Sequence, residues 1–436
     1  MSYERSVSAS PHELVSESVW HVQLPELRFG RGSVRELGFQ LADLGVPEGA
    51  HGLLVTDGTL ADLGHAGRVT DHLEDDGFAV DVYDDCPREP AVADVDDCIE
   101  FVRDEQGADG YDFYVGLGGG SCMDVAKATR AVVANGGEVV DYIAEPTGEG
   151  ERLTESGPPL VLMPTTAGTG SEISPVAIFA VEEKNIKEGI SSNHVRADAA
   201  VLDPTFTTTL PPEETAKTAM DALGHAIEGY TTHDYDSLLR PEDAADRPVY
   251  AGRSPFTEMF SEQAIRLLSG NVRRAVHNGD DLEARENMLQ GALFGAIAGL
   301  TAGATLCHAM AYPVGNRYHT NHGETIAVLT PASTIDYNAA SDPSRFADVA
   351  ELFGVDTGGM TDRAAADALK QQYIQLQKDL SVLPSGLHEL AGVTEDDLDW
   401  LAKQTVDTQK RLLRTNPRPV TQEDVREVFA DALHNW

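Results

Sequence analysis

The sequence predicts an α/β region built on a doubly wound, mostly parallel sheet, followed by an all-helical region. The chain has 436 residues, and a chain of this length usually folds around two or more hydrophobic cores. Short apolar runs alternate with amphipathic helical patterns up to about residue 204, as in parallel strands joined by crossover helices. After residue 212 only long helical patterns follow. We therefore expect an α/β domain at 18–204 and a helical domain at 205–436.

The elements of the first region are predicted in order along the chain. Two short strand-like runs at 19–24 and 27–29 are divided by Pro25. Buried strands are expected at 51–56, 78–83, 113–117 and 160–163, and helices at 67–76, 92–106 and 122–134. Because ligands of open α/β sheets bind at the carboxyl ends of the strands, this pattern predicts a nucleotide-binding domain.

The second region is predicted to consist of helices around a charge-free centre. Helices are expected at 213–231, 255–276, 281–300, 344–353, 363–380, 395–404 and 423–433, and a surface excursion near the cleft at 233–253. The segment 287–316 has no Asp, Glu, Lys or Arg, and is long enough to span a membrane. It is rich in Gly and Ala and stands alone, which favours buried helices.

Composition limits the partners and the compartment. With 32 Lys+Arg against 72 Asp+Glu, the formal charge is −40 and would repel phosphate backbones, so we expect no nucleic-acid partner. The acids are spread along the chain, as in proteins kept soluble in concentrated salt; an ordinary acidic cytosolic protein is the alternative. The four cysteines form no close-spaced pattern and residues 1–16 have no apolar core, which predicts a cytoplasmic protein without a membrane partner.

A glycine cluster follows the third buried strand. Gly118, Gly119 and Gly120 precede Ser121 and the start of a predicted helix. Bare N–H groups and the positive helix end would face one point there, which is typical of a phosphate cradle. Asp124, three residues after Ser121, forms a plausible capping pair with it. The spacing is not the G-x-G-x-x-G fingerprint, so a tight strand-to-helix turn remains the alternative.

Two further segments at strand ends are candidates for cofactor contact. The loop after the fourth buried strand carries four hydroxyl groups, on Thr165, Thr166, Thr169 and Ser171, which favours ligand contact over a solvated connection. Asp57 ends the first buried strand, where a carboxylate can accept ribose hydroxyls and repel a 2′-phosphate. It would favour NAD over NADP, although Asp57 and Gly58 also form an ordinary turn dipeptide.

The helical region contains a candidate metal site. Asp221 and His225 lie four residues apart in a predicted helix, so both side chains share one face. His308 lies in the charge-free segment, and His322 follows fourteen residues later. Three imidazoles and one carboxylate suit a divalent ion with room for a substrate oxygen, and Glu228 would orient a ligand. Taken alone, such residues more often form an ordinary ion pair or a satisfied polar side chain, and only the combination indicates a metal site.

These motifs together resemble the iron-containing (group III) alcohol dehydrogenases. The resemblance rests on 118–121 (GGGS), 164–172 (PTTAGTGSE), 220–230 (MDALGHAIEGY) and the pair of His308 and His322, and it extends from about 27 to 424. It implies Fe²⁺, or alternatively Zn²⁺, on Asp221, His225, His308 and His322. It also implies NAD along Asp57, Gly118, Gly119, Gly120, Ser121, Asp124, Thr165, Thr166, Thr169 and Lys187. The implied partners are a small alcohol, aldehyde or hydroxyacid, and a second copy of the chain in a homodimer or larger homo-oligomer.

Within that family, 247–255, 280–285 and 306–313 are similar to the hydroxyacid-oxoacid transhydrogenases, whereas 313–322 is shorter. Tyr312 stands where many relatives have a histidine and is the candidate catalytic proton carrier, with a water molecule as the alternative. We expect a metal-dependent, NAD-linked alcohol dehydrogenase, with a transhydrogenase holding its cofactor tightly, or a non-catalytic NAD-binding protein, as the alternatives. A carboxylate substrate needs cations, and Arg253 and Arg317 are the only candidates near the cleft. This scarcity favours alcohol turnover over transhydrogenation.

Overall fold

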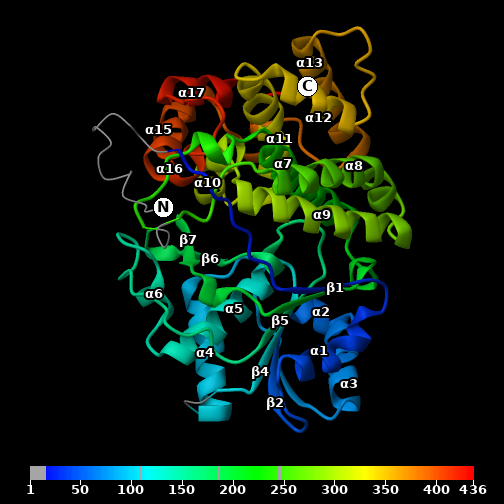
Figure 1. Cartoon of the computed structure of the whole chain (residues 1–436), viewed down its shortest axis with the longest axis vertical. Coiled ribbons are helices and arrows are strands. Elements are labelled where there is room, and N and C mark those ends of the chain that lie inside the picture. The colour runs from blue at the N-terminus through cyan, green and yellow to red at the C-terminus, as the bar shows by residue number, and fades with distance from the viewer. Residues whose placement is uncertain (1–15, 108–109, 185, 244–246) are drawn as a thin grey trace, which may run out of the picture.

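The computed structural model describes residues 16–107, 110–184, 186–243 and 247–436. Residues 1–15, which include most of the N-terminal segment without an apolar core, lie outside this part of the chain. Figure 1 shows a sheet-containing region, coloured blue to cyan, beneath a layer of helices coloured green to red. The predicted fold class, an α/β region followed by an all-helical region, is confirmed.

The first region contains a six-stranded sheet in which every neighbouring pair is parallel. Its order is β1 (Glu26–Phe29), β8 (Ala199–Leu202), β5 (Leu160–Pro164), β4 (Phe113–Gly118), β2 (His51–Val55) and β3 (Ala79–Tyr83). In register, Gly118 of β4 faces Pro164 of β5, so the two strands end together. The loops that follow them therefore meet at one edge of the sheet.

Helices cover both faces of the sheet. They are α1 (Leu37–Asp43), α2 (Gly58–Asp62), α3 (His65–Asp75), α4 (Val92–Gln106), α5 (Gly120–Asn135) and α6 (Val139–Tyr142). Alternate strand residues enter two separate cores, as the period of a strand requires: Leu53 packs with α4 and α5, and Leu54 packs with α1 and α3. A sheet buried on both faces reads as continuous apolar runs, which is why its central strands were predictable.

An antiparallel hairpin lies outside the main sheet. It pairs β6 (Val176–Val181) with β7 (Ile186–Ser191). The hairpin packs on α5, and the N–H of Lys187 donates to Asn316 of the helical region at 3.2 Å. It therefore connects the two regions beside the carboxyl edge of the sheet.

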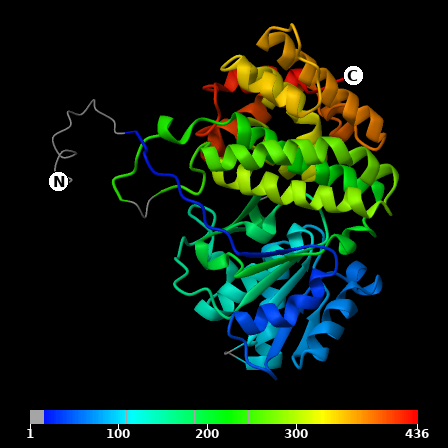
Figure 2. The same cartoon turned by 45° about the vertical axis from the view of Figure 1, so that its right-hand side comes forward.

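The helical region is built around α7 (Pro212–Thr231), in which every residue from 219 to 231 is buried. The other helices are α8 (Pro255–His277), α9 (Leu282–Ala302), α10 (Leu306–Tyr318), α11 (His322–Thr330), α12 (Pro343–Leu352), α13 (Asp362–Leu380), α14 (Leu387–Ala391), α15 (Leu398–Thr408), α16 (Lys410–Leu413) and α17 (Gln422–Asp431), with a π-helical segment at Pro331–Tyr337. Helices α8 and α9 lie side by side over the sheet region, as Figure 2 shows. A Cβ on Gly299 of α9 would meet the His225 carbonyl at 2.7 Å, so α9 approaches α7 closely.

Three differences from the predicted elements have physical causes. No strand forms at 19–24, because the chain there is largely exposed and reaches the sheet only at β1. The hairpin and β8 were not predicted: β8 is a four-residue run with two alanines, too short for a periodic signal. Helix α11 was missed, and α10 was expected only as part of the buried helices at 287–316, without bounds, since α10 contains Pro313 and is separated from α11 by only three residues.

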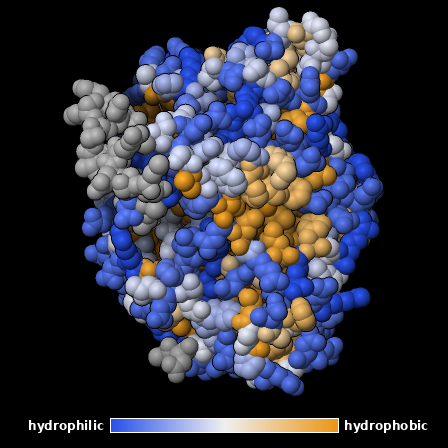
Figure 3. Space-filling view, in the orientation of Figure 1, coloured by the Kyte–Doolittle hydropathy of each residue, from blue (hydrophilic) through white to orange (hydrophobic). Residues whose placement is uncertain are grey.

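The charge-free segment forms α9 and α10, whose residues are mostly buried. Among the described residues no single helix meets the length and hydropathy of a membrane span; α9 and α10 meet them only as a pair bent by 98°. Figure 3 shows apolar surface in the area of α9 and β1. The partly buried Leu27 and Phe29 belong to β1, and Phe294 belongs to α9. Such surface suits association between copies, and the homo-oligomer stays a prediction.

Candidate metal and cofactor site

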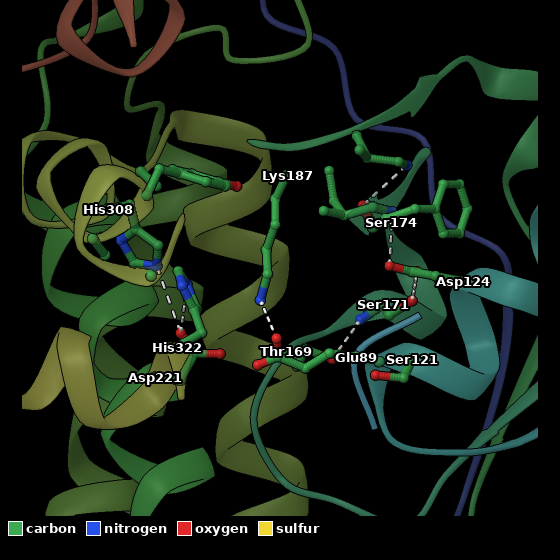
Figure 4. A pocket seen from close by; sticks show the side chains of 18 of the residues that line it. Glu89, Ser121, Asp124, Thr169, Ser171, Ser174, Lys187, Asp221, His308 and His322 are labelled. Carbon is green, nitrogen blue, oxygen red and sulfur yellow. Dashed lines mark hydrogen bonds and ion pairs between the residues drawn. The ribbon is translucent and has the colours of Figure 1, made fainter. Parts of the chain in front are cut away.

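Three predicted ligands converge at the centre of the helical region. Asp221 comes from α7, His308 from the first turn of α10 and His322 from the first residue of α11. One ligand atom from each lies within 4.8 Å of the others, and Asp221 Oδ1 is 3.7 Å from His308 Nε2 and 3.5 Å from His322 Nε2. Atoms that each stand about 2 Å from one ion are separated by about 3.3 Å, so the spacing suits a metal. Figure 4 shows the three side chains pointing toward one another.

Several of these polar atoms are buried without a hydrogen bond. Asp221 Oδ1, His308 Nε2 and His225 Nδ1 have no hydrogen bond among the described residues. Leaving buried polar atoms unpaired is costly, and a bound cation would satisfy them. His225 lies outside the converging trio, but its ring stacks on that of His308 with centroids 4.5 Å apart. Its place as fourth ligand therefore stays a prediction.

Glu228 fixes the orientation of His308. Its carboxylate accepts the backbone N–H of Thr305 and of Cys307, both at 2.9 Å, and so caps the start of α10. It also accepts the hydroxyls of Thr305 and Thr334 and bonds His308 Nδ1 at 2.5 Å. Because Nδ1 is held in this way, Nε2 faces Asp221 and is free to bind a metal. Glu228 therefore occupies the orienting position that the sequence predicted for it.

The protonation states suit metal ligation. Burial lowers the pKa of His225 and of His322 to about 4, so both imidazoles are neutral at pH 7. Burial also acts to lower the pKa of His308, but Glu228 and Asp221 outweigh it and raise that pKa to about 9. Burial acts to raise the pKa of Asp221, yet the three neighbouring imidazoles hold it well below its usual range. A bound cation would replace the proton on His308 Nε2 and leave the Nδ1 bond to Glu228 in place.

The glycine cluster forms the turn from β4 into α5. Gly119 precedes the helix and Gly120 is its first residue. A Cβ on Gly118 would lie 2.7 Å from Cys122 Sγ, and one on Gly120 would lie 3.1 Å from Thr169 Oγ1, so the turn leaves the backbone bare and close-packed. The predicted capping by Ser121 is wrong: its hydroxyl donates instead to the Arg88 carbonyl at 2.6 Å.

Asp124 is tied into the protein beneath this turn. Its carboxylate accepts the Ser171 hydroxyl at 2.5 Å and the Ile178 N–H at 3.0 Å. The buried ammonium of Lys127 lies 2.8 Å from it and also donates to the carbonyls of Ser171 and Val176. This network neutralises the Asp124 charge near the turn, so a carboxylate is tolerated beside a phosphate site. It also fixes the loop after β5 against α5.

Some of the predicted cofactor residues line a cavity, and the others lie outside its lining. Gly120, Ser121, Asp124, Thr169 and Lys187 line a cavity of about 320 Å³ that also reaches Asp221, His225, His308 and His322. Gly118, Gly119, Thr165 and Thr166 lie in the two loops behind it, where the Thr165 N–H donates to the Gly118 carbonyl. Asp57 caps α2 through the Leu60 N–H, and its other oxygen is 3.6 Å from Cys122 Sγ in the first turn of α5.

The cavity walls include side chains that sequence reasoning missed. Tyr312 lines the cavity as expected, and burial raises its pKa to about 12, so its hydroxyl keeps its proton at pH 7. The expected cations Arg253 and Arg317 are wrong: they pair with Asp234 and Asp397. The cations that line the cavity are Arg88, Lys187 and Arg411. A local cluster of basic residues around Arg411 in this acidic chain was the available signal.

Comparison with known families and proteins agrees with this geometry. The model for "Iron-containing alcohol dehydrogenase" matches residues 25–204, and the C-terminal model of the same family matches 249–433. The mitochondrial hydroxyacid-oxoacid transhydrogenase of Rattus norvegicus is 32% identical, covering 99% of this chain and 93% of that protein. Long-chain-alcohol dehydrogenase 1 of Geobacillus thermodenitrificans is 33% identical, covering 95% of this chain and 97% of that protein.

Solved structures share the fold over nearly the whole chain. A 1,3-propanediol oxidoreductase superposes with a TM-score of 0.84 at 30% identity, covering 95% of this chain and 100% of that chain. A sulfoacetaldehyde reductase from Bifidobacterium kashiwanohense, in complex with NAD⁺, superposes with a TM-score of 0.78 at 25% identity, covering 96% and 99%. By its sequence and its fold, this chain belongs to the iron-containing alcohol dehydrogenase family.

Proposed function

We propose that this protein transfers hydride between the hydroxyl-bearing carbon of a small alcohol or hydroxyacid and NAD, with a divalent metal on Asp221, His225, His308 and His322. The observation that carries this proposal is a single cavity, lined at one end by buried ligand atoms without partners and at the other by the first turn of α5. Family membership and the NAD⁺ complex of a neighbour support the same chemistry. Fe²⁺ follows the family, and the ligand types also suit Zn²⁺.

The residues of the chain have separate tasks in this reaction. When bound, a metal would supply Lewis-acid chemistry at the substrate oxygen and NAD would supply the hydride acceptor. Asp221 and neutral imidazoles hold the ion, while Glu228 fixes the ring of His308. The bare turn at Gly119 and Gly120 offers N–H groups and the positive end of α5 to the pyrophosphate. Tyr312, protonated at pH 7, is placed to donate a hydrogen bond inside the cavity.

The first prediction concerns the metal. His308→Ala and His322→Ala should each lower the bound metal from about one ion per chain to below about a tenth, because each removes a ligand and tetrahedral sites need every one. Turnover should fall by about 1,000-fold or more, while NAD still binds because its loops lie in the other region. Metal analysis and calorimetric NAD titration measure the two effects. His277→Ala, an exposed histidine far from the cavity, is the control; a His308→Ala protein with full metal content would refute the ligand set.

The second prediction concerns the choice of cofactor. Removing the Asp57 carboxylate should lower the ratio of kcat/KM for NAD to that for NADP by about tenfold, because a charge that repels a 2′-phosphate is lost. Asp57→Ala also removes the cap of α2, whereas Asp57→Asn keeps a capping oxygen without the charge. Both variants should relax the preference. A wild-type enzyme that prefers NADP would contradict this assignment.

The third prediction follows from the formal charge of −40. We propose that the protein works in a salt-rich cytoplasm, where ions screen the repulsion between its carboxylates. Its melting temperature should rise by about 10 °C or more between dilute buffer and 2 M KCl. Sucrose at equal osmolality is the control, since it does not screen charge. Equal melting temperatures in the two salt conditions would rule the proposal out.

A second candidate function is transhydrogenation between a hydroxyacid and an oxoacid with retained cofactor. It is favoured by the similarity to the rat transhydrogenase and by the cations Lys187 and Arg411 in the cavity. The two functions differ in whether cofactor must be added.

The fourth prediction separates these two functions. With 4-hydroxybutyrate and 2-oxoglutarate but no nucleotide, we expect at most about one 2-hydroxyglutarate per active site, because a dehydrogenase releases its cofactor after each turnover. Simple alcohols with added NAD should give NADH continuously. Chromatography of the acids and absorbance of NADH measure both. Many turnovers to 2-hydroxyglutarate without nucleotide would instead establish transhydrogenation.

A further inference from the structure

Arg411 is a cation at the junction of two cavities. It lines the cavity that contains the metal ligands, and it also lines a larger outer cavity of about 860 Å³. The two cavities share Ile178, Lys187, Tyr312 and Arg411. A molecule that enters from the outer cavity therefore passes this arginine on its way to the metal ligands.

The surroundings of Arg411 leave its charge available to a ligand. Its guanidinium lies over the ring of Tyr250, 5.2 Å from the centroid, and interacts with the Tyr312 hydroxyl. Glu188 acts on it electrostatically, but no carboxylate of the described residues forms an ion pair with it. In a chain with 72 acidic residues, an arginine that faces a cavity without an ion pair is well placed to bind an external anion.

The other cavity cations have different positions or partners. Lys187 pairs with Glu89 at 3.2 Å. Arg88 lines only the inner cavity, where its carbonyl accepts the Ser121 hydroxyl beside the glycine turn, so it belongs to the cofactor end. Arg152 lines only the outer cavity. Arg411 alone among the described arginines combines contact with both cavities and freedom from an ion pair.

Tyr312 connects Arg411 to the metal ligands. Tyr312 lies one helical turn after His308 on α10, and its ring centroid is 5.9 Å from that of His322. Burial raises the pKa of Tyr312, and the nearby positive charge of Arg411 acts to lower it. The side chain of Tyr312 thus separates the guanidinium of Arg411 from the metal ligands. This span suits a short substrate with a hydroxyl at one end and a carboxylate at the other.

We propose that Arg411 binds the carboxylate of a short hydroxyacid whose hydroxyl-bearing carbon lies at the metal ligands. The assignment rests on the proposed function, since it places the reacting carbon at that cluster. Arginine suits the task because its planar fork can form two hydrogen bonds to one carboxylate, and the ring of Tyr250 lies against the guanidinium. Arg411 is in this reading a residue that determines specificity.

The test compares two substrates of nearly equal shape, of which only the first is charged: 4-hydroxybutyrate and 4-hydroxybutanamide, oxidised with saturating NAD by metal-loaded enzyme. Arg411→Gln should lower kcat/KM for the acid about 10- to 100-fold more than for the amide, because one charge-assisted pair is lost. Arg411→Lys should recover part of the difference, since it keeps the charge without the fork. Lys410→Gln removes the adjacent exposed cation, which lines neither cavity, and should change the acid-to-amide ratio by less than about threefold.

A binding measurement keeps this inference distinct from the proposed function. Calorimetry with butyrate, which has no hydroxyl to oxidise, should show binding to the wild type and a loss of about tenfold or more in Arg411→Gln. Equal losses for acid and amide, or a rise in the KM for NAD alone, would assign Arg411 to the fold or to the cofactor and overturn the inference. If the enzyme oxidises alcohols but does not bind butyrate, the inference is refuted and the proposed function stands. If butyrate binds in a manner that depends on Arg411 but no substrate is turned over, the proposed function is refuted and the binding role of Arg411 stands.

Discussion

The burial of the Asp221 carboxylate without a hydrogen-bond donor is the constraint on which the site depends. Asp221 lies in the stretch of α7 where every residue is buried, and its Oδ1 has no partner among the described residues. A buried charge is stable only beside a compensating charge or donor. The first turns of α10 and α11 supply imidazoles for this purpose, and the glycine at position 299 lets α9 pack against the backbone of α7. The packing of the helical region thus holds the ligands at fixed separations.

Two carboxylates on one face of α7 have opposite environments. Glu228, two turns after Asp221, accepts backbone and hydroxyl donors and caps α10, so the protein itself satisfies its charge. Asp221 receives no such donors and leaves an oxygen toward the histidines. One acidic side chain therefore stabilises the structure and orients His308, while the other remains open to a cation. Both carboxylates lie on the same face of α7, and only the surrounding helices distinguish them.

Periodicity and motif spacing determined how far the sequence could predict this molecule. The central strands and long helices were predictable because their apolar patterns persist over a whole element, and the histidines because their positions match a family motif. The strand at 199–202 was not, because it is only four residues long, and neither was the hairpin, whose second strand carries Lys187 and mixes charged and apolar residues without strict alternation. Arg411 was missed for another reason: its place beside Tyr250 and Tyr312 depends on the return of the C-terminal helices to the cavity, a tertiary contact that no local pattern encodes.

The overall charge and the cavity cations act over different distances. A net charge of −40 repels an anionic cofactor or hydroxyacid at long range, whereas Arg88, Lys187 and Arg411 attract anions inside the cavity. At molar salt the Debye length falls to about 3 Å, which removes the long-range repulsion but leaves contacts between a guanidinium and a carboxylate largely intact. In the salt-rich cytoplasm that we propose, screening would favour both the folding of this acidic chain and the entry of its anionic ligands. The acidic surface thus keeps anions away at long range, and the three cations that line the cavity act on an anion only after it has entered.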